Sequence, residues 1–158
     1  MPRLQPARRA ALINTYKKGY QEVMAALTGI TQAELDAPQV AGAWTPRQIV
    51  HHLADSEMTS AIRFRRLLAE DAPDIQGYDE QAFARHLYYD RPIDASLEAM
   101  AAARRTTADM LDRLSDAEWS RGGTHSESGP YTVEDWLEIY AAHGHDHAEQ
   151  IRLCRQPH

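Results

Sequence analysis

The chain has 158 residues, a formal net charge of −6 and 43% hydrophobic residues, which is enough for one domain with a real core. Its acidic balance argues against a nucleic-acid-binding protein, because such a surface is normally basic and clustered. No apolar run is long enough to cross a membrane, and the charged first residues lack the apolar stretch of a secretory signal. The single cysteine, Cys154, has no partner for an intramolecular disulfide. We therefore expect one cytoplasmic domain over residues 1–158.

The residue types favour an all-helical fold, because Ala, Leu, Glu and Arg dominate and β-branched alternation is nearly absent. The first predicted helix covers about residues 6–28, where apolar residues recur every three or four positions. A short helical turn is expected at the capping box of residues 31–34. The second helix is predicted from Pro46, directly after the N-cap Thr45, to about residue 70.

The second half of the chain adds two more long helices. Residues 76–91 lack a clear amphipathic pattern and predict a crossover connection with a short helix near residues 80–86. A third helix is expected at about residues 94–114, and the glycine-rich residues 120–131 predict a loop. A fourth helix follows the N-cap Thr132. Four long helices, with the longer connection between the second and the third, predict an all-α four-helix bundle, a fold that often holds metal sites in its core.

Three histidines stand out as candidate metal ligands. His143 and His147 lie four residues apart on the fourth predicted helix, and therefore on one face about one turn apart. That face is apolar, where two imidazoles without a partner would be costly. His52 of the second helix also falls on an apolar face, and three neutral ring nitrogens could bind one ion and leave a position open for chemistry. His51 flanks the same face, so helix geometry does not choose between it and His52.

The other histidines are weaker candidates, since a histidine taken alone is more often exposed or hydrogen-bonded than a ligand. His145 is expected to point away from the core toward solvent. His86, His125 and His158 lie in connections or at the end of the chain. Position 144 is glycine, so the chain lacks the His-Glu-x-x-His motif of zinc proteases.

Two segments resemble the signature of the DinB-like superfamily: Trp44-Thr-Pro-Arg-Gln-Ile-Val-His-His-Leu-Ala-Asp-Ser and Tyr140-Ala-Ala-His-Gly-His-Asp-His-Ala-Glu-Gln-Ile. With the shorter matches Ile62-Arg-Phe64 and Tyr78-Asp-Glu80, the likeness spans roughly residues 16–153. More closely, the chain is similar to the YfiT group of metal-dependent hydrolases, which includes bacillithiol transferase-like proteins. The resemblance implies a four-helix bundle, a homodimer, and one nickel or zinc ion per chain with the ligands His52, His143 and His147.

One departure concerns the second helix, where the relatives have a histidine and this chain has Glu57. The closing motif is also less rich in histidine than theirs. Neither difference removes a ligand that the resemblance implies. Glu57 is expected either to alter the pocket or to be exposed.

Two reactions follow from such a site, and both take a small-molecule substrate. Three imidazoles leave the charge of a divalent ion uncompensated, which would acidify a bound water or a bound low-molecular-weight thiol. The first case predicts a hydrolase that attacks a carbonyl or amide carbon, and the second an S-transferase that attacks an electrophile. The alternative is a non-catalytic metal-binding or stress-related interaction module, because a fold alone does not establish a reaction.

Side chains three or four residues from these histidines are expected to orient the imidazoles. Asp55 is the first candidate for a general base or an orienting carboxylate, although a surface pairing with Arg63 or Lys17 is an equal alternative. Trp44 could form a wall of the pocket or act as a hydrophobic staple before the helix. The remaining candidates for the pocket are Gln48, Ser56, Tyr140 and Gln150.

Overall fold

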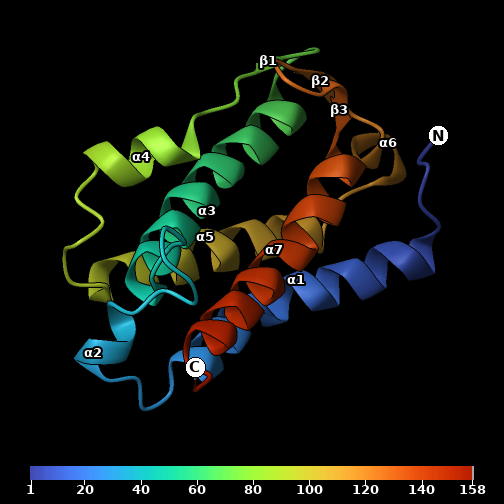
Figure 1. Cartoon of the computed structure of the whole chain (residues 1–158). Helices are drawn as coiled ribbons and strands as arrows, with labels where there is room; N and C mark the ends of the chain where they lie inside the picture. The colour runs from blue at the N-terminus through green and yellow to red at the C-terminus, as the bar shows by residue number, and fades with distance from the viewer. Residues whose placement is uncertain (158) are drawn as a thin grey trace.

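Four long helices form a bundle in the computed structural model, which describes residues 1–157 (Figure 1). The long helices are α1 (Pro6–Leu27), α3 (Pro46–Ala69), α5 (Asp94–Leu111) and α7 (Val133–Cys154). Short helices lie between them: α2 (Gln32–Leu35), α4 (Glu80–His86) and α6 (Asp116–Trp119). Helix α3 packs against α5 and α7, and α1 packs against the same two helices, which closes the bundle. The predicted all-α four-helix bundle is confirmed.

The two helices that carry the candidate ligands both begin at a capping box. The Thr45 hydroxyl accepts a hydrogen bond from the backbone N–H of Gln48, whose side-chain oxygen accepts one from Thr45 N at 2.9 Å. Thr132 and Asp135 exchange the equivalent bonds at the start of α7. Each box satisfies N–H groups that a helix start leaves without partners. The starts of α3 and α7, and hence the positions of their side chains, are fixed locally by sequence.

A small sheet at one end of the bundle replaces the loop that was predicted for residues 120–131 (Figure 1). Strand β2 (Gly122–His125) pairs antiparallel with β3 (Gly129–Thr132) and parallel with β1 (Asp74–Ile75). A Cβ atom at Gly123 would lie 2.0 Å from the carbonyl oxygen of Pro73, so glycine is needed for this close approach. Strands this short and rich in glycine lack the alternating pattern by which sequence reveals a strand.

The apolar core consists of two clusters, one at each end of the bundle. The first surrounds Trp136, whose ring lies 4.7 Å from that of Phe64 and whose Nε1 donates to the Ser60 carbonyl. The second contains Ile49 and Ile151, from α3 and α7. On α7 the clusters are separated by residues 142–147, the stretch that holds the candidate ligands. No helix among residues 1–157 has the length and apolar character needed to span a lipid bilayer.

Helices α1 and α7 approach each other closely at two glycines. A Cβ atom added at Gly144 would lie 3.1 Å from the Cα atom of Gly19, which is tighter than normal packing. Position 144 therefore faces the backbone of α1 and has no room for a side chain. This contact gives a structural reason for the absence of a protease-type glutamate between His143 and His147.

Candidate metal centre

His52, His143 and His147 come together between α3 and α7, with one ring nitrogen from each lying within 4.8 Å of the others. The ring centroids are 4.6 Å apart for His143 and His147, and 4.8 Å apart for His52 and His147. The four-residue spacing on α7 places two of the rings edge to face, and the contact between α3 and α7 supplies the third. The structure thus brings together the three histidines that the sequence singled out.

Burial keeps these imidazoles neutral. It lowers the pKa of His52 to about 3 and that of His143 to about 2, with a smaller contribution from the neighbouring His147. The pKa of His147 is also lowered by burial, against the opposing effect of its hydrogen bond with Gln150. Neutral imidazole is the form that binds metal ions, so none of the three rings must lose a proton before coordination.

The ring nitrogens of the three histidines are available to bind one shared ion. His147 Nδ1 donates to the side-chain oxygen of Gln150 at 2.8 Å, which leaves the lone pair on Nε2. The Nδ1 atoms of His52 and His143 are buried and have no hydrogen-bond partner among the described residues. Unpaired buried nitrogens are costly in an apolar core. Three neutral nitrogen donors grouped in this way are a suitable ligand set for a divalent transition-metal ion.

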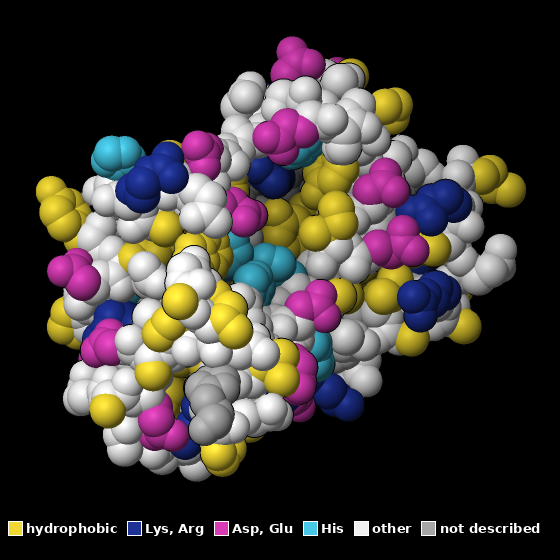
Figure 2. Space-filling model, in the orientation of Figure 1, with side chains coloured by type: hydrophobic (Ala, Val, Ile, Leu, Met, Phe, Trp, Pro, Cys, Tyr) yellow, Lys and Arg dark blue, Asp and Glu magenta, His cyan; other side chains and the backbone are white. Residues whose placement is uncertain are grey.

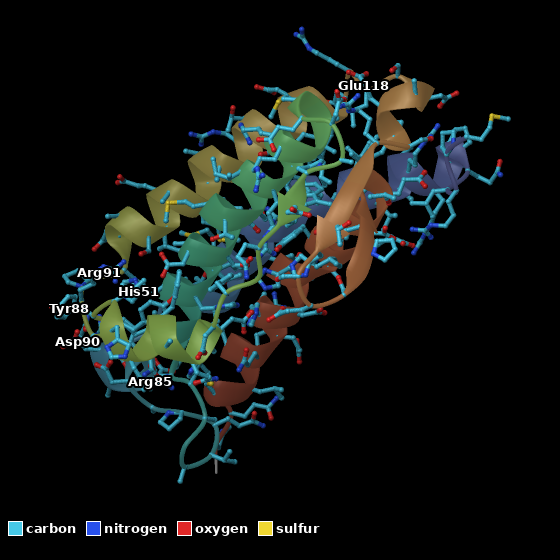
Figure 3. All side chains as sticks on the ribbon, turned by 90° about the horizontal axis from the view of Figure 1, so that it is seen from above. His51, Arg85, Tyr88, Asp90, Arg91 and Glu118 are labelled. Atoms are coloured by element: carbon cyan, nitrogen blue, oxygen red, sulfur yellow. The ribbon has the colours of Figure 1, made fainter. Side chains whose placement is uncertain are left out.

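His51 has a different role from its neighbour in the chain. The Ser96 hydroxyl lies 2.7 Å from His51 Nδ1, and His51 Nε2 donates to the Arg91 carbonyl at 2.9 Å. Figure 3 shows His51 beside Arg91, where the segment after α4 leads into α5. Because both ring nitrogens are engaged, His51 connects α3 to α5 and is not part of the three-histidine cluster.

The remaining histidines lie apart from this cluster. His145 is half-buried and donates to the Thr15 carbonyl of α1 at 2.8 Å, so the expectation that it points to solvent is wrong. The cause is the close approach of α1 to α7. His86 is exposed on α4, and His158 lies outside the described residues.

Some of the expected supporting residues surround the cluster. The Trp44 ring packs on His52 with a centroid distance of 4.8 Å, and Gln150 holds His147. Asp55, by contrast, accepts a hydrogen bond from the Tyr89 hydroxyl at 2.7 Å and has no bond to any of the three rings in the described part of the chain. Gln48 uses its side-chain oxygen in the capping box of α3.

Two pockets open beside the three histidines. The first, of about 220 Å³, is lined by His143, by Ser56 and Tyr140 as expected, and by residues of the β2–β3 hairpin. The second, of about 280 Å³, is lined by His147, Trp44 and Gln150. Glu80, at the start of α4, lines both pockets. Figure 2 shows histidine side chains at the bottom of a hollow in the molecular surface, with acidic side chains at its edge.

The first pocket contains residues that sequence reasoning missed. His125, set aside because it lay in a presumed loop, is carried to the pocket by β2, and its Nδ1 accepts a hydrogen bond from Glu127 N at 3.2 Å. Arg63 and Tyr78 also line this pocket. The sequence pointed to these two only through the segments Ile62-Arg-Phe64 and Tyr78-Asp-Glu80, which resemble the family signature.

Comparison with known proteins agrees with this architecture. The chain is 36% identical over 128 residues to a protein of Oceanobacillus iheyensis named "Putative metal-dependent hydrolase", with 80% of this chain and 74% of the relative covered. A Bacillus mycoides protein of the same description is 33% identical over 135 residues, covering 85% and 78% of the two chains.

Two solved structures resemble the fold. One is YfiT from Bacillus subtilis, described as "a probable metal-dependent hydrolase with an unusual four-helix bundle topology", with a TM-score of 0.88 and 32% identity over 96% of this chain and 89% of that one. The other, the four-helix bundle protein TT2238, has a TM-score of 0.63 at 21% identity, covers 89% and 95% of the two chains, and shows the fold alone. The profile of the DinB superfamily matches residues 15–151. The resemblance seen in the sequence is confirmed, and the chain belongs to the DinB superfamily.

Proposed function

We propose that the protein is a metal-dependent hydrolase that binds one divalent ion, nickel or zinc, through His52, His143 and His147. The observation that carries this proposal is the cluster of three neutral imidazoles, with ligand atoms within 4.8 Å of one another, beside a pocket of about 220 Å³. The names of the relatives support the same reaction class. Because the three ligands carry no charge, the bound ion would keep its double positive charge and lower the pKa of a water or thiol at its open position.

The protein's own groups then position and polarise the substrate. Gln150 fixes the tautomer of His147, and Trp44 excludes water from one side of His52. His125 must carry its proton on Nε2, because its Nδ1 accepts from a backbone N–H. It can therefore donate a hydrogen bond to a substrate carbonyl oxygen in the pocket. Glu80 is exposed at both openings, where its carboxylate can accept a proton.

S-transfer from a low-molecular-weight thiol is the second candidate reaction. The same observation favours it, since an anionic sulfur compensates the charge of an ion with three neutral ligands as well as an anionic oxygen does. The two reactions differ in the nucleophile and not in the protein groups that hold the ion.

A substrate panel separates these reactions. Zinc- or nickel-loaded protein is mixed with activated ester and amide substrates, and separately with bacillithiol, mycothiol, glutathione or cysteine plus monochlorobimane. Cleavage that is lost in His147→Ala but kept in His51→Ala supports the hydrolase. Bimane conjugation with the same dependence supports the transferase. Activity in neither arm, with the ion bound, favours a metal-binding module without catalysis.

The metal site has an independent test. Elemental analysis of the purified protein is expected to give about one divalent ion per chain. The triple variant His52→Ala, His143→Ala, His147→Ala is expected to bind none, and His51→Ala to bind the full amount. Full metal content in the triple variant would contradict the proposed ligand set.

A further inference from the structure

The pocket beside His143 contains a cation that has no carboxylate partner. Arg63 of α3 donates from Nη2 to the Gln76 carbonyl at 2.9 Å and from Nη1 to the Tyr140 hydroxyl at 3.3 Å. Its Nε atom is buried without a hydrogen-bond partner, and no carboxylate of the described residues forms an ion pair with its guanidinium. Asp55, which the sequence offered as a partner for Arg63, instead accepts a hydrogen bond from the Tyr89 hydroxyl. A half-buried charge without a counter-ion is costly, which suggests that its partner is a ligand.

The groups that accept hydrogen bonds from Arg63 are uncharged, and Glu80 and Glu127 line the pocket without forming an ion pair with it. Its guanidinium carbon lies 5.8 Å from the centre of the Tyr78 ring, and the buried Tyr78 hydroxyl has no hydrogen-bond partner among the described residues. Burial, together with the charge of Arg63, lowers the pKa of His125 and so holds it neutral. Burial raises the pKa of Tyr78 to about 12, which keeps its hydroxyl protonated as a donor. The unpaired atoms Arg63 Nε, Tyr78 Oη and His143 Nδ1 thus all belong to residues that line one pocket.

The guanidinium and the three histidines lie close enough for one small molecule to reach both. Tyr140 contacts Arg63 through its hydroxyl, and its ring lies 5.7 Å from that of His143. Both Arg63 and His143 line the same pocket of about 220 Å³. A ligand of a few carbon atoms can therefore place one end at the guanidinium and the other at the three-histidine cluster.

We propose that Arg63, assisted by Tyr78, binds a carboxylate group of the substrate, so that the site acts on small carboxylic acids. A planar carboxylate can accept two parallel N–H bonds from a guanidinium. A phosphate dianion is disfavoured relative to a carboxylate, because Glu80 and Glu127 line the same pocket and their repulsion of a ligand grows with its negative charge. This inference rests on the proposed function, since it names the substrate class of that site.

The test compares two ligands of similar size and shape, 3-mercaptopropionate with its charged carboxylate and 3-mercaptopropionamide with a neutral amide, by calorimetric titration of the zinc-loaded protein. The acid is expected to bind about 10- to 100-fold more tightly than the amide, as for hydrogen bonds to a charged group. Arg63→Gln should remove this preference, because it weakens binding of the acid far more than binding of the amide. Arg63→Lys keeps the charge but loses the two parallel N–H donors of the guanidinium, so it should retain part of the preference for the acid.

A matched control lies one helical turn away on α3. Arg66 is bonded to Glu70 and to the Asp74 carbonyl, and it does not line the pocket, so Arg66→Gln should keep the full preference for the acid. Tyr78→Phe removes one hydroxyl and should weaken binding of the acid severalfold. An equal loss for both ligands in Arg63→Gln, or the same loss in Arg66→Gln, overturns the proposal.

The carboxylate site can be tested independently of the proposed function. The same two ligands are titrated into metal-free protein and followed by ¹⁵N chemical shifts, while metal content is measured by elemental analysis. A preference for the acid that depends on Arg63 supports the carboxylate site even if no ion is bound. Equal binding of acid and amide in both forms, or binding of neither, overturns the carboxylate site even if the ion is bound.

Discussion

Glu57 of α3 and Arg104 of α5 form an ion pair inside the bundle, where their side chains are 1% and 4% exposed. Arg104 also donates from Nη2 to the Tyr16 carbonyl at 2.5 Å, and its guanidinium lies 4.0 Å from the centre of the Tyr16 ring. Glu57 is therefore not exposed. It belongs to a polar contact that joins α3, α5 and α1 between the two apolar clusters.

We expect Glu57→Ala to destabilise the metal-free protein by about 3–5 kcal/mol, because it leaves the Arg104 charge buried without a partner. The double variant Glu57→Leu, Arg104→Met should recover much of this loss, since it removes both charges. Urea unfolding measures the free energies. The matched control is Asp112→Asn, which breaks the exposed pair with Lys17 and should cost less than about 1 kcal/mol. A single-variant loss no larger than the control would refute the interpretation of Glu57 as part of the core.

Gln150→Ala should weaken zinc binding by about 10- to 100-fold, because the amide oxygen fixes the orientation and tautomer of His147. Competition with a chromophoric chelator measures the affinity. Glu149→Ala, at the adjacent exposed position, should leave it unchanged. Equal affinities in the two variants would show that the hydrogen bond does not support the ligand.

His51 and His52 should give opposite results when each is replaced by alanine. His51→Ala removes one buried and one partly buried hydrogen bond, so it should lower the stability of the metal-free protein by about 1–3 kcal/mol and leave metal content unchanged. His52→Ala removes a nitrogen that has no partner, so it should abolish stoichiometric metal uptake at a smaller cost in stability. Urea unfolding and elemental analysis of both variants measure the contrast, which disappears if the two histidines are equivalent.

Gly144→Ala should destabilise the protein although alanine is the better helix former. Overpacking a close contact costs about 1–3 kcal/mol, and the gain in helix propensity offsets at most about 1 kcal/mol. The added methyl group would press on the backbone of Gly19, which cannot move as a side chain can. Thermal unfolding measures the loss. An unchanged or raised Tm would mean that α1 shifts freely relative to α7.

The main helices and the common face of His143 and His147 were predictable because local rules determine them. Thr45 and Thr132 fix the starts of α3 and α7 through short-range hydrogen bonds, and the spacing of His143 and His147 fixes their common face. The choice of His52 over His51 came from the family resemblance. In the structure the difference lies in two hydrogen bonds from His51 to residues more than 35 positions away in sequence.

The rest of the site depends on contacts between distant segments. Asp55 has the spacing of an orienting carboxylate, yet Tyr89 occupies its oxygen, and the position of Tyr89 is set by the path of the chain after α4. His125 reaches the pocket through strands too short to leave a sequence pattern. Ile139 is an apolar residue of α7 that is nevertheless 51% exposed, because it lines the pocket. Helical periodicity cannot distinguish a core position from a pocket rim.

Helix α4 contributes Glu80 to both openings but buries none of its own residues. A segment with so little buried surface can separate from the bundle at a much smaller free-energy cost than unfolding of the whole domain. The candidate ligands, in contrast, lie on α3 and α7, which are held by the core. Under the proposed function, entry of substrate and retention of the ion therefore depend on parts of the chain with different stability. If the three histidines hold an ion as proposed, substitutions in α4 would change which molecules enter without weakening ion binding. Such a bundle could then acquire new substrates during evolution while its fold is preserved.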